Sequence, residues 1–215
     1  MSKQPFVLYV ADAYCGWCFG FGPLLKEFEA ANRDRVEFRV ISGGLFLGVR
    51  AQPISQYPHI PEANARIARL TGVRFGTAYN TVLEQGAFVL DSAAAAAGLA
   101  ALRAQDERRG IEFFHQIQQA FYVDGCSLSD PDTYVRIATE SGLDPDRAEQ
   151  MLASGEADTL AQADFAMART LGATTYPTVL VIDGNNVHRL PATGTPLDVM
   201  NRELAEALAA EEGAS

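Results

Sequence analysis

The pair of cysteines near the start of the chain constrains the fold more than any other feature of the sequence. Residues 14–18 read YCGWC, and the short apolar run PFVLYVADAY that leads into them predicts a buried strand. After the pair, FGFGPLLKEFEAANRD places apolar side chains at helical spacing, which predicts a helix to about Asn32. Gly20, Gly22 and Pro23 predict that its first part is irregular or kinked. VEFRVIS, residues 36–42, predicts a second strand. Strand, cysteine pair, helix and strand form one βαβ unit, and such a crossover requires parallel strands.

The predicted place of the two cysteines suits thiol chemistry. Cys15 is expected just before or at the N-terminus of the helix, where unpaired backbone N–H groups and the helix dipole stabilise an anion. We therefore expect a lowered pKa and a nucleophilic thiolate at Cys15. Cys18 lies about one turn further along, so the pair can close and open as a disulfide. Two buried small apolar side chains are the alternative, but that reading does not explain why the pair brackets Gly-Trp at a strand-to-helix junction.

The other cysteine and histidine residues do not suggest a metal centre or a disulfide scaffold. The chain has three cysteines, and the third, Cys126, follows a glycine and has no partner at short spacing. Three thiols are too few for a disulfide-stabilised chain of this size. A structural zinc site needs four ligands, usually from two closely spaced pairs, and no histidine here is paired in that way. We also expect no nucleotide or flavin cofactor, because GNN and GGL lack the spacing of a phosphate-binding loop.

A second informative segment lies far along the chain, at residues 173–190, and reads ATTYPTVLVIDGNNVHRL. TVLVID and VHRL predict two strands joined by a turn at GNN, which is a β-hairpin. Pro177 precedes the first of these strands and cannot donate a hydrogen bond to the sheet. X-Pro bonds adopt the cis form readily, and a cis Pro177 would leave the backbone of Tyr176 available to an extended substrate chain. An ordinary turn proline is the alternative.

Taken together, these motifs resemble the thioredoxin fold, in which a C-x-x-C opens a helix and a distant proline precedes a β-hairpin. Pro23, five residues after the second cysteine, also matches a helix proline of that superfamily. Four segments are similar to the DsbA-like family: ADAYCGWCFGFGP, GGL, AFYVDG…LSDPDTY and YPTVLV. Within it, the sequence resembles a branch of predicted cytoplasmic protein-disulfide isomerases and FrnE-like proteins. The resemblance extends over essentially the whole chain.

The resemblance implies an α/β fold: a thioredoxin-like core with a mixed sheet, interrupted by a helical insertion. The core would comprise residues 1–58 and 173–215, and the insertion residues 59–172. The sequence independently favours helices in the middle segment, where no convincing strand pattern occurs. DPDTYVRIATESG and DPDRAEQMLASG both begin with Asp-Pro and end near Gly, which are helix start and stop signals. TPLDVMNRELAEALAAEE predicts a closing helix with one apolar face.

The implied activity is thiol–disulfide exchange with protein or small thiol substrates, by an oxidoreductase or isomerase. Cys15 would attack a substrate disulfide, and Cys18 would resolve the mixed disulfide. Trp17, Tyr176 and Pro177 are predicted to contact the substrate. Between the cysteines, Gly-Trp differs from the Pro-His of strongly oxidising members and from the Gly-Pro of thioredoxin. Since no histidine is present there to stabilise the Cys15 thiolate, we expect a less oxidising pair.

Asp12 is a further candidate, because it lies three residues before Cys15. Its carboxylate could tune the thiol pKa or assist proton transfer to Cys18. It could equally cap the turn or the helix, which is the interpretation we favour.

Two other functions remain open. Kappa-type glutathione transferases and hydroxychromene-carboxylate isomerases look similar overall and use a single Ser or Cys with glutathione. Cys18 argues against them, because chemistry at one centre does not need a second thiol. A thiol-based sensor or binding module without enzymatic activity is the other alternative.

Charge and composition limit the partners. The formal net charge of −10 argues against nucleic acid or an anionic membrane as the main partner. No apolar stretch approaches the roughly 20 residues that span a bilayer, and MSKQP lacks the basic cluster of a secretory signal. We therefore expect a cytoplasmic protein whose partners are a disulfide-containing substrate and a thiol reductant such as glutathione. The oligomeric state is left open.

Overall fold

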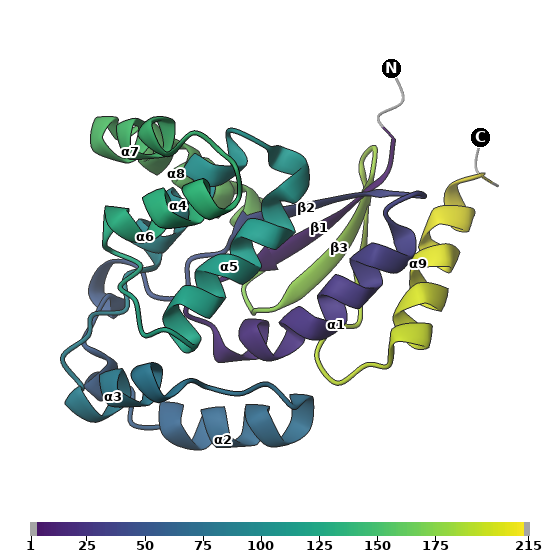
Figure 1. The fold of residues 1–215 in the computed structure, drawn as a ribbon. Coiled ribbons are helices and arrows are strands. Elements are labelled where there is room, and N and C mark those ends of the chain that lie inside the picture. Colours follow the sequence, from purple (N-terminus) through teal and green to yellow (C-terminus); the bar gives the residue numbers. More distant parts are fainter. Residues whose placement is uncertain (1–3, 213–215) are drawn as a thin grey trace.

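A four-stranded mixed sheet lies at the centre of the computed structural model, which describes residues 4–212 (Figure 1). Its strands are β1 (Phe6–Ala11), β2 (Glu37–Ser42), β3 (Thr178–Asp183) and β4 (Asn186–Leu190), in the order β2-β1-β3-β4. β1 pairs with β2 in parallel, β3 runs antiparallel to β1, and β4 runs antiparallel to β3. The predicted parallel βαβ unit and the predicted hairpin are therefore confirmed, and so is the α/β fold with a mixed sheet.

Helices make up most of the remaining chain. They are α1 (Gly16–Asn32), α2 (Ile60–Thr71), α3 (Thr77–Gln85), α4 (Ser92–Arg103), α5 (Gly110–Tyr122), α6 (Pro131–Glu140), α7 (Pro145–Ser154), α8 (Glu156–Thr170) and α9 (Leu197–Glu212), with short 3-10 turns at η1 (Gly48–Arg50), η2 (Ile54–Gln56) and η3 (Glu107–Arg109). Figure 1 shows α1, α5 and α9 on one face of the sheet, and α2 and α3 near the start of α1. Within residues 4–212, no helix is both long and apolar enough to cross a membrane.

The alternation of side chains along β1 assigns its residues to two cores. Val7 and Tyr9 point to the face covered by α1, α5 and α9, and they belong to the larger core cluster. Leu8 and Val10 point to the opposite face, where they pack with Ala168 from α8. Because both faces are covered, β1 is apolar along its whole length, as expected for a central strand of a covered sheet.

Local capping explains where several helices begin. The Asp130 side chain accepts a hydrogen bond from the backbone N–H of Asp132 at the start of α6. At the start of α7, the Asp144 side chain accepts from the backbone N–H groups of Asp146 and Arg147. The Asp-Pro start signals are confirmed by these contacts. The structure has one continuous helix α1 with Pro23 inside it, so its first part is not irregular, and a kink there stays a prediction.

The division of the chain into a core and an insertion remains a prediction. The ring of Tyr9 on β1 lies between Phe21 of α1 and Phe114 of α5, at centroid distances of 5.9 and 5.6 Å. Phe114 belongs to the segment proposed as the insertion, residues 59–172. The two proposed parts therefore share a single packed core on this face of the sheet.

Candidate active site

The two cysteines of the motif occupy different environments at the start of α1. Cys15 is the N-cap residue: its backbone N–H donates to the Asp12 carbonyl at 3.0 Å, and its own carbonyl accepts from Phe19 at 3.1 Å. Both thiols are free. The exposed fraction is 6% for Cys15 and 0% for Cys18, so Cys15 is the thiol that a substrate can approach. The expected position of Cys15 at the helix start is confirmed.

Burial controls the protonation of the second thiol. It raises the pKa of Cys18 well above the ordinary value, and the neighbouring Cys15 raises it further. The backbone N–H of Asp12 and the hydroxyl of Tyr9 oppose this shift, because both favour the thiolate. Cys18 therefore rests as a neutral thiol, and it must lose a proton before it can act as a nucleophile.

The segment before β3 meets Cys15 through its backbone. The Tyr176–Pro177 peptide bond is cis, as the sequence suggested. The Cys15 thiol donates to the Tyr176 carbonyl, with sulfur and oxygen 3.6 Å apart. The Tyr176 hydroxyl donates in turn to the Gly43 carbonyl at 2.5 Å. A Cβ atom at Gly43 would lie only 1.9 Å from Cε1 of Tyr176, so the ring requires a glycine at this position.

The Asp12 side chain links the loop before α1 to the loop after β2. Its carboxylate is buried and accepts hydrogen bonds from the backbone N–H groups of Tyr14, at 2.9 Å, and Leu45, at 2.7 Å. Burial outweighs these hydrogen bonds and raises the pKa of Asp12 above its ordinary value. The contacts agree with the capping interpretation favoured from the sequence. Toward Cys18, the backbone N–H of Asp12 favours the thiolate and so lowers the pKa of that thiol.

Residues of α2 pack against Gly16 and Trp17, the dipeptide between the cysteines. Trp17 is half-buried, and the guanidinium of Arg66 lies 5.7 Å from the centroid of its ring. A Cβ at Gly16 would lie 3.0 Å from Cδ1 of Ile67, and one at Gly20 would lie 2.6 Å from Cγ2 of the same residue. These two glycines, one turn apart, allow α2 to pack directly against the start of α1. The sequence analysis found no reason for either glycine.

An arginine on the hairpin holds the segment on both sides of the cis bond. Arg189 donates to the hydroxyl oxygens of Thr175, at 3.2 Å, and Thr178, at 2.5 Å. The sequence analysis missed this contact. The register of the hairpin could have predicted it. Arg189 pairs with Leu180 across the hairpin, and Thr178 lies two residues before Leu180, so Arg189 and Thr178 share one face of the sheet.

The remaining candidates lie outside this cluster of contacts. Cys126 is half-buried and accepts a hydrogen bond from Arg136 at 3.7 Å. His115 lies on α5, where burial lowers its pKa. Across the part of the chain that the structure describes, no group of three or more His, Cys, Asp or Glu side chains could hold a metal ion.

Comparison with known proteins gives relatives over nearly the full length. Among solved structures, the cytosolic disulfide reductase DsbM from Pseudomonas aeruginosa is 27% identical, with a TM-score of 0.78, and the match covers 98% of this chain and 100% of that one. A second DsbM structure, with GSH, has a TM-score of 0.75 at 26% identity and covers 96% and 99% of the two chains. A putative protein disulfide isomerase from Nitrosomonas europaea shares the fold, with 21% identity, a TM-score of 0.83 and coverage of 96% and 98%.

A curated relative and a family model complete the comparison. The ClpXP adapter protein SpxH of Bacillus subtilis (strain 168) is 22% identical over 178 residues, which is 82% of this chain. The match spans only 58% of that relative's length. The model of the DSBA-like thioredoxin domain family matches residues 7–205. This match covers most of the chain, and we conclude that the protein belongs to the DSBA-like thioredoxin domain family and has the fold of its disulfide oxidoreductases.

Proposed function

We propose that this protein is a thiol–disulfide oxidoreductase that reduces disulfides in proteins or small thiol compounds. The observation that carries the proposal is the arrangement of three groups. Cys15 reaches the surface at the start of α1, Cys18 is fully buried one turn behind it, and the Tyr176 carbonyl accepts the Cys15 thiol proton at 3.6 Å. Such a set supplies a nucleophile, a resolving thiol and a backbone acceptor for an extended substrate.

The proposed reaction moves two electrons to the substrate. The Cys15 thiolate attacks one sulfur of the substrate disulfide, which forms a mixed disulfide and releases the other sulfur as a thiolate that takes a proton. Cys18 then loses its proton and attacks the Cys15 sulfur. The Cys15–Cys18 disulfide forms, and the second substrate sulfur leaves as a thiol. A thiol reductant such as glutathione restores the protein, and two molecules of it become one disulfide.

The Tyr176 carbonyl would change partners during this cycle. In the reduced protein it accepts the Cys15 thiol. Once Cys15 ionises, that donor is gone, and the carbonyl can accept a backbone N–H of the substrate instead. Trp17 lies half-buried at the same end of α1, where its exposed part can contact a substrate.

Two observations support the reducing direction and a small thiol as reductant. The dipeptide between the cysteines contains no histidine to stabilise a thiolate, so the pair lacks one feature of strong oxidants. The relative DsbM is described as a cytosolic disulfide reductase, and one of its structures contains GSH. By extension, we propose that this protein acts in the cytoplasm and uses glutathione as its reductant.

Replacing Cys18 separates this proposal from chemistry at a single thiol. Reduced Cys18→Ser protein should attack glutathione disulfide or a protein disulfide and stop at a mixed disulfide, which mass spectrometry detects. Wild-type protein should instead turn over with excess glutathione. Full turnover by the Cys18→Ser variant would contradict the proposal and would favour a glutathione transferase or isomerase acting through Cys15 alone.

A second candidate function is protein binding, and the observation that favours it is the similarity to the adapter SpxH. An adapter function does not require thiol exchange, so it should survive in a Cys15→Ser/Cys18→Ser double variant. Pull-down with the wild type and the double variant in parallel distinguishes the two roles. A partner retained equally by both proteins would support the adapter role, whereas one captured only through a mixed disulfide would support exchange.

A further inference from the structure

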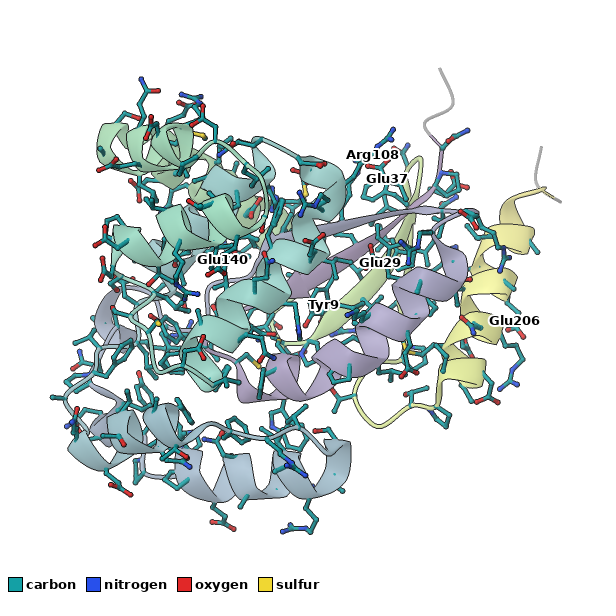
Figure 2. All side chains as sticks on the ribbon, in the orientation of Figure 1. Tyr9, Glu29, Glu37, Arg108, Glu140 and Glu206 are labelled. Carbon is teal, nitrogen blue, oxygen red and sulfur yellow. The ribbon has the colours of Figure 1, made fainter. Side chains whose placement is uncertain are left out.

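The two ends of β2 are held by ion pairs in different surroundings. At its start, Glu37 and Arg39 form an ion pair with Nε and Oε1 3.0 Å apart and side chains about 40% exposed. Figure 2 shows Glu37 near Arg108 at this surface. At the other end of the strand, an ion pair joins Arg103, the last residue of α4, to Asp164 of α8. Their side chains are only 11% and 7% exposed, so this second pair is buried.

The buried pair also binds the backbone of β2. Arg103 Nη1 donates to Asp164 Oδ2 at 2.9 Å, and Nη2 donates to Oδ1 at 3.3 Å. The same Nη1 donates to the Val40 carbonyl, and the Ser42 N–H donates to Asp164 Oδ2 at 3.0 Å. In the described sheet β2 is an edge strand, so these backbone groups face no neighbouring strand. The pair supplies the hydrogen bonds that such a strand would otherwise make.

The strand end held in this way leads directly to the cysteine pair. Gly43 follows Ser42, and its carbonyl accepts a hydrogen bond from the Tyr176 hydroxyl at 2.5 Å. The carbonyl of the same tyrosine accepts from the Cys15 thiol at 3.6 Å. A continuous series of hydrogen bonds and covalent bonds therefore connects the Asp164 carboxylate with the Cys15 sulfur through Ser42, Gly43 and Tyr176.

We propose that Arg103 and Asp164 are positioning residues for Cys15, because they fix the end of β2 against which Tyr176 places its carbonyl. This inference rests on the proposed disulfide exchange, in which that carbonyl accepts a backbone N–H of the substrate. Both residues act through Gly43 and Tyr176. The helices between β2 and β3 thereby determine part of the active-site geometry.

Stability alone does not account for an ion pair at this place. Removing two charges from water costs about as much as their attraction returns, and well-packed apolar side chains often stabilise a protein equally well. Apolar side chains, however, cannot bind the Val40 carbonyl and the Ser42 N–H. Arginine suits this task better than lysine, since its planar fork fixes the directions of its N–H groups. Direction of the strand end is therefore what this pair contributes beyond packing.

The test compares the loss of one charge with the loss of both. All rates are measured in a Cys18→Ser/Cys126→Ser reference protein, in which Cys15 is the single thiol. Arg103→Met leaves the Asp164 carboxylate buried and unpaired, so the urea midpoint of unfolding should fall. In Arg103→Met/Asp164→Leu no charge is left unpaired, and the midpoint should return most of the way to the reference value.

Attack on glutathione disulfide should not recover with stability. Neither variant holds the Ser42 end of β2, so we expect mixed-disulfide formation at Cys15 to be about tenfold slower in both, as for other misaligned reactants. Mass spectrometry over time gives the rate. Attack at the reference rate in the double variant would overturn the positioning role and would leave the pair as a purely structural contact.

A second reagent separates positioning from general damage to the thiol. Iodoacetamide needs only the Cys15 thiolate and does not align with the Tyr176 carbonyl. Its reaction should therefore not slow in the double variant, whereas the reaction with glutathione disulfide should. Equal slowing with both reagents would contradict the inference, because it would show that Cys15 itself is disturbed.

Arg39→Met is the matched control on the same strand. It breaks the exposed ion pair with Glu37 at the start of β2 and leaves the Ser42 end unchanged. Because exposed ion pairs contribute little, attack on glutathione disulfide should stay within about twofold of the reference rate. A tenfold slowing here would mean that any lost charge on β2 has this effect, and the inference would be wrong.

Met151→Ala controls for loosened helices. Met151 is fully buried and packs against small side chains of α4 and α8, namely Ala97, Ala101 and Ala157. The substitution creates a cavity beside these helices, so the urea midpoint should fall while the buried ion pair stays in place. Attack should remain within about twofold of the reference rate. Slowing as large as in the double variant would assign the effect to loose packing and overturn the inference.

The two possible failures are distinguishable. If the reference protein forms no mixed disulfide with glutathione disulfide, the proposed function fails and the inference fails with it. If it forms one and Arg103→Met/Asp164→Leu forms it equally fast, the proposed function stands and only the positioning role of the buried pair fails.

Discussion

Cys15 and Cys18 are the same residue type, three positions apart on one helix, yet their surroundings differ in almost every respect. On the outer side, Cys15 caps the helix, retains some exposed surface and donates to the Tyr176 carbonyl. On the inner side, Cys18 is fully buried, and burial raises its pKa. The motif therefore supplies two thiols, while distant segments give them different exposure and different hydrogen-bond partners.

The segments that create this difference come from separate parts of the chain. On the outer side, Gly43 and Tyr176 join the loop after β2 to the loop before β3. On the inner side, Cys18 belongs to a packed core that also contains Tyr9 of β1 and Phe114 of α5. Substitutions on the two sides should therefore affect the two thiols separately.

Alkylation rates should separate the two thiols most strongly. In a Cys126→Ser background, iodoacetamide should modify the Cys18→Ser variant at least about 100-fold faster than the Cys15→Ser variant, because only the thiolate reacts and Cys18 is buried. Mass spectrometry over time gives both rates. In denaturant the two variants should react equally. Similar rates in the folded proteins would contradict the proposal that Cys15 is the nucleophile and Cys18 the resolving thiol.

Gly43→Ala should disrupt the outer side. The added Cβ would lie 1.9 Å from the Tyr176 ring, so the ring and its carbonyl must move away from Cys15. We expect a loss of about 1–3 kcal/mol in the free energy of unfolding, as for other overpacked sites, measured by urea denaturation. Attack by Cys15 on glutathione disulfide should also slow, by about tenfold.

A double variant controls for unrelated damage in Gly43→Ala. Because Tyr176→Ala removes the ring that clashes, Gly43→Ala should cost much less stability in a Tyr176→Ala background. The attack rate should not recover, since the carbonyl is no longer positioned by the ring. Equal destabilisation in both backgrounds would show that the clash with Tyr176 is not the cause.

The pH dependence of stability should reveal Cys18 on the inner side. Burial raises its pKa in the folded protein well above that of an ordinary thiol, so the folded state retains a proton that the unfolded chain loses. The resulting stability is fully present below the unfolded pKa and is lost as pH rises through the folded pKa. Between these values, the unfolding free energy of reduced wild type should fall relative to Cys18→Ala by about 1.4 kcal/mol per pH unit. A constant difference across alkaline pH would contradict the described burial.

Arg66→Ala should have the smallest effect. Its guanidinium lies 5.7 Å from the Trp17 ring centroid, and an exposed cation–π contact is worth about 0.5–1 kcal/mol. We expect stability to fall by no more than this and Trp17 emission to shift toward longer wavelengths. Arg69→Ala, at an exposed position one turn later on α2, is the control. An effect shared by both variants would mean that charge, and not the ring contact, is responsible.

Local patterns in the sequence predicted the elements that carry the pair. The apolar run before the cysteines, the helical spacing after them and the hairpin at the other end of the chain all have short-range signatures. They predicted that Cys15 lies at the helix start and left open a cis bond at Pro177, and the structure has both. Whether these residues perform catalysis stays a prediction.

Long-range packing was beyond the reach of such patterns. The hydrogen bond between Tyr176 and Gly43 joins positions 133 residues apart, and Ile67 of α2 explains the glycines of α1. In the sequence, Tyr9 is one more β-forming residue of an apolar strand, and its place between Phe21 and Phe114 depends on how α1 and α5 cover the sheet. The irregular form predicted for the start of α1 does not occur, since the helix continues through Pro23.

The reduction potential of the Cys15–Cys18 pair decides whether the protein can act as a disulfide reductase. The chain has a single tryptophan, Trp17, between the two thiols, so its fluorescence in glutathione buffers reports the redox state of the pair. The account predicts a potential near that of thioredoxin, about −270 mV. A potential between about −120 and −180 mV would indicate an oxidant or isomerase, and a pair that forms no disulfide would contradict the account altogether.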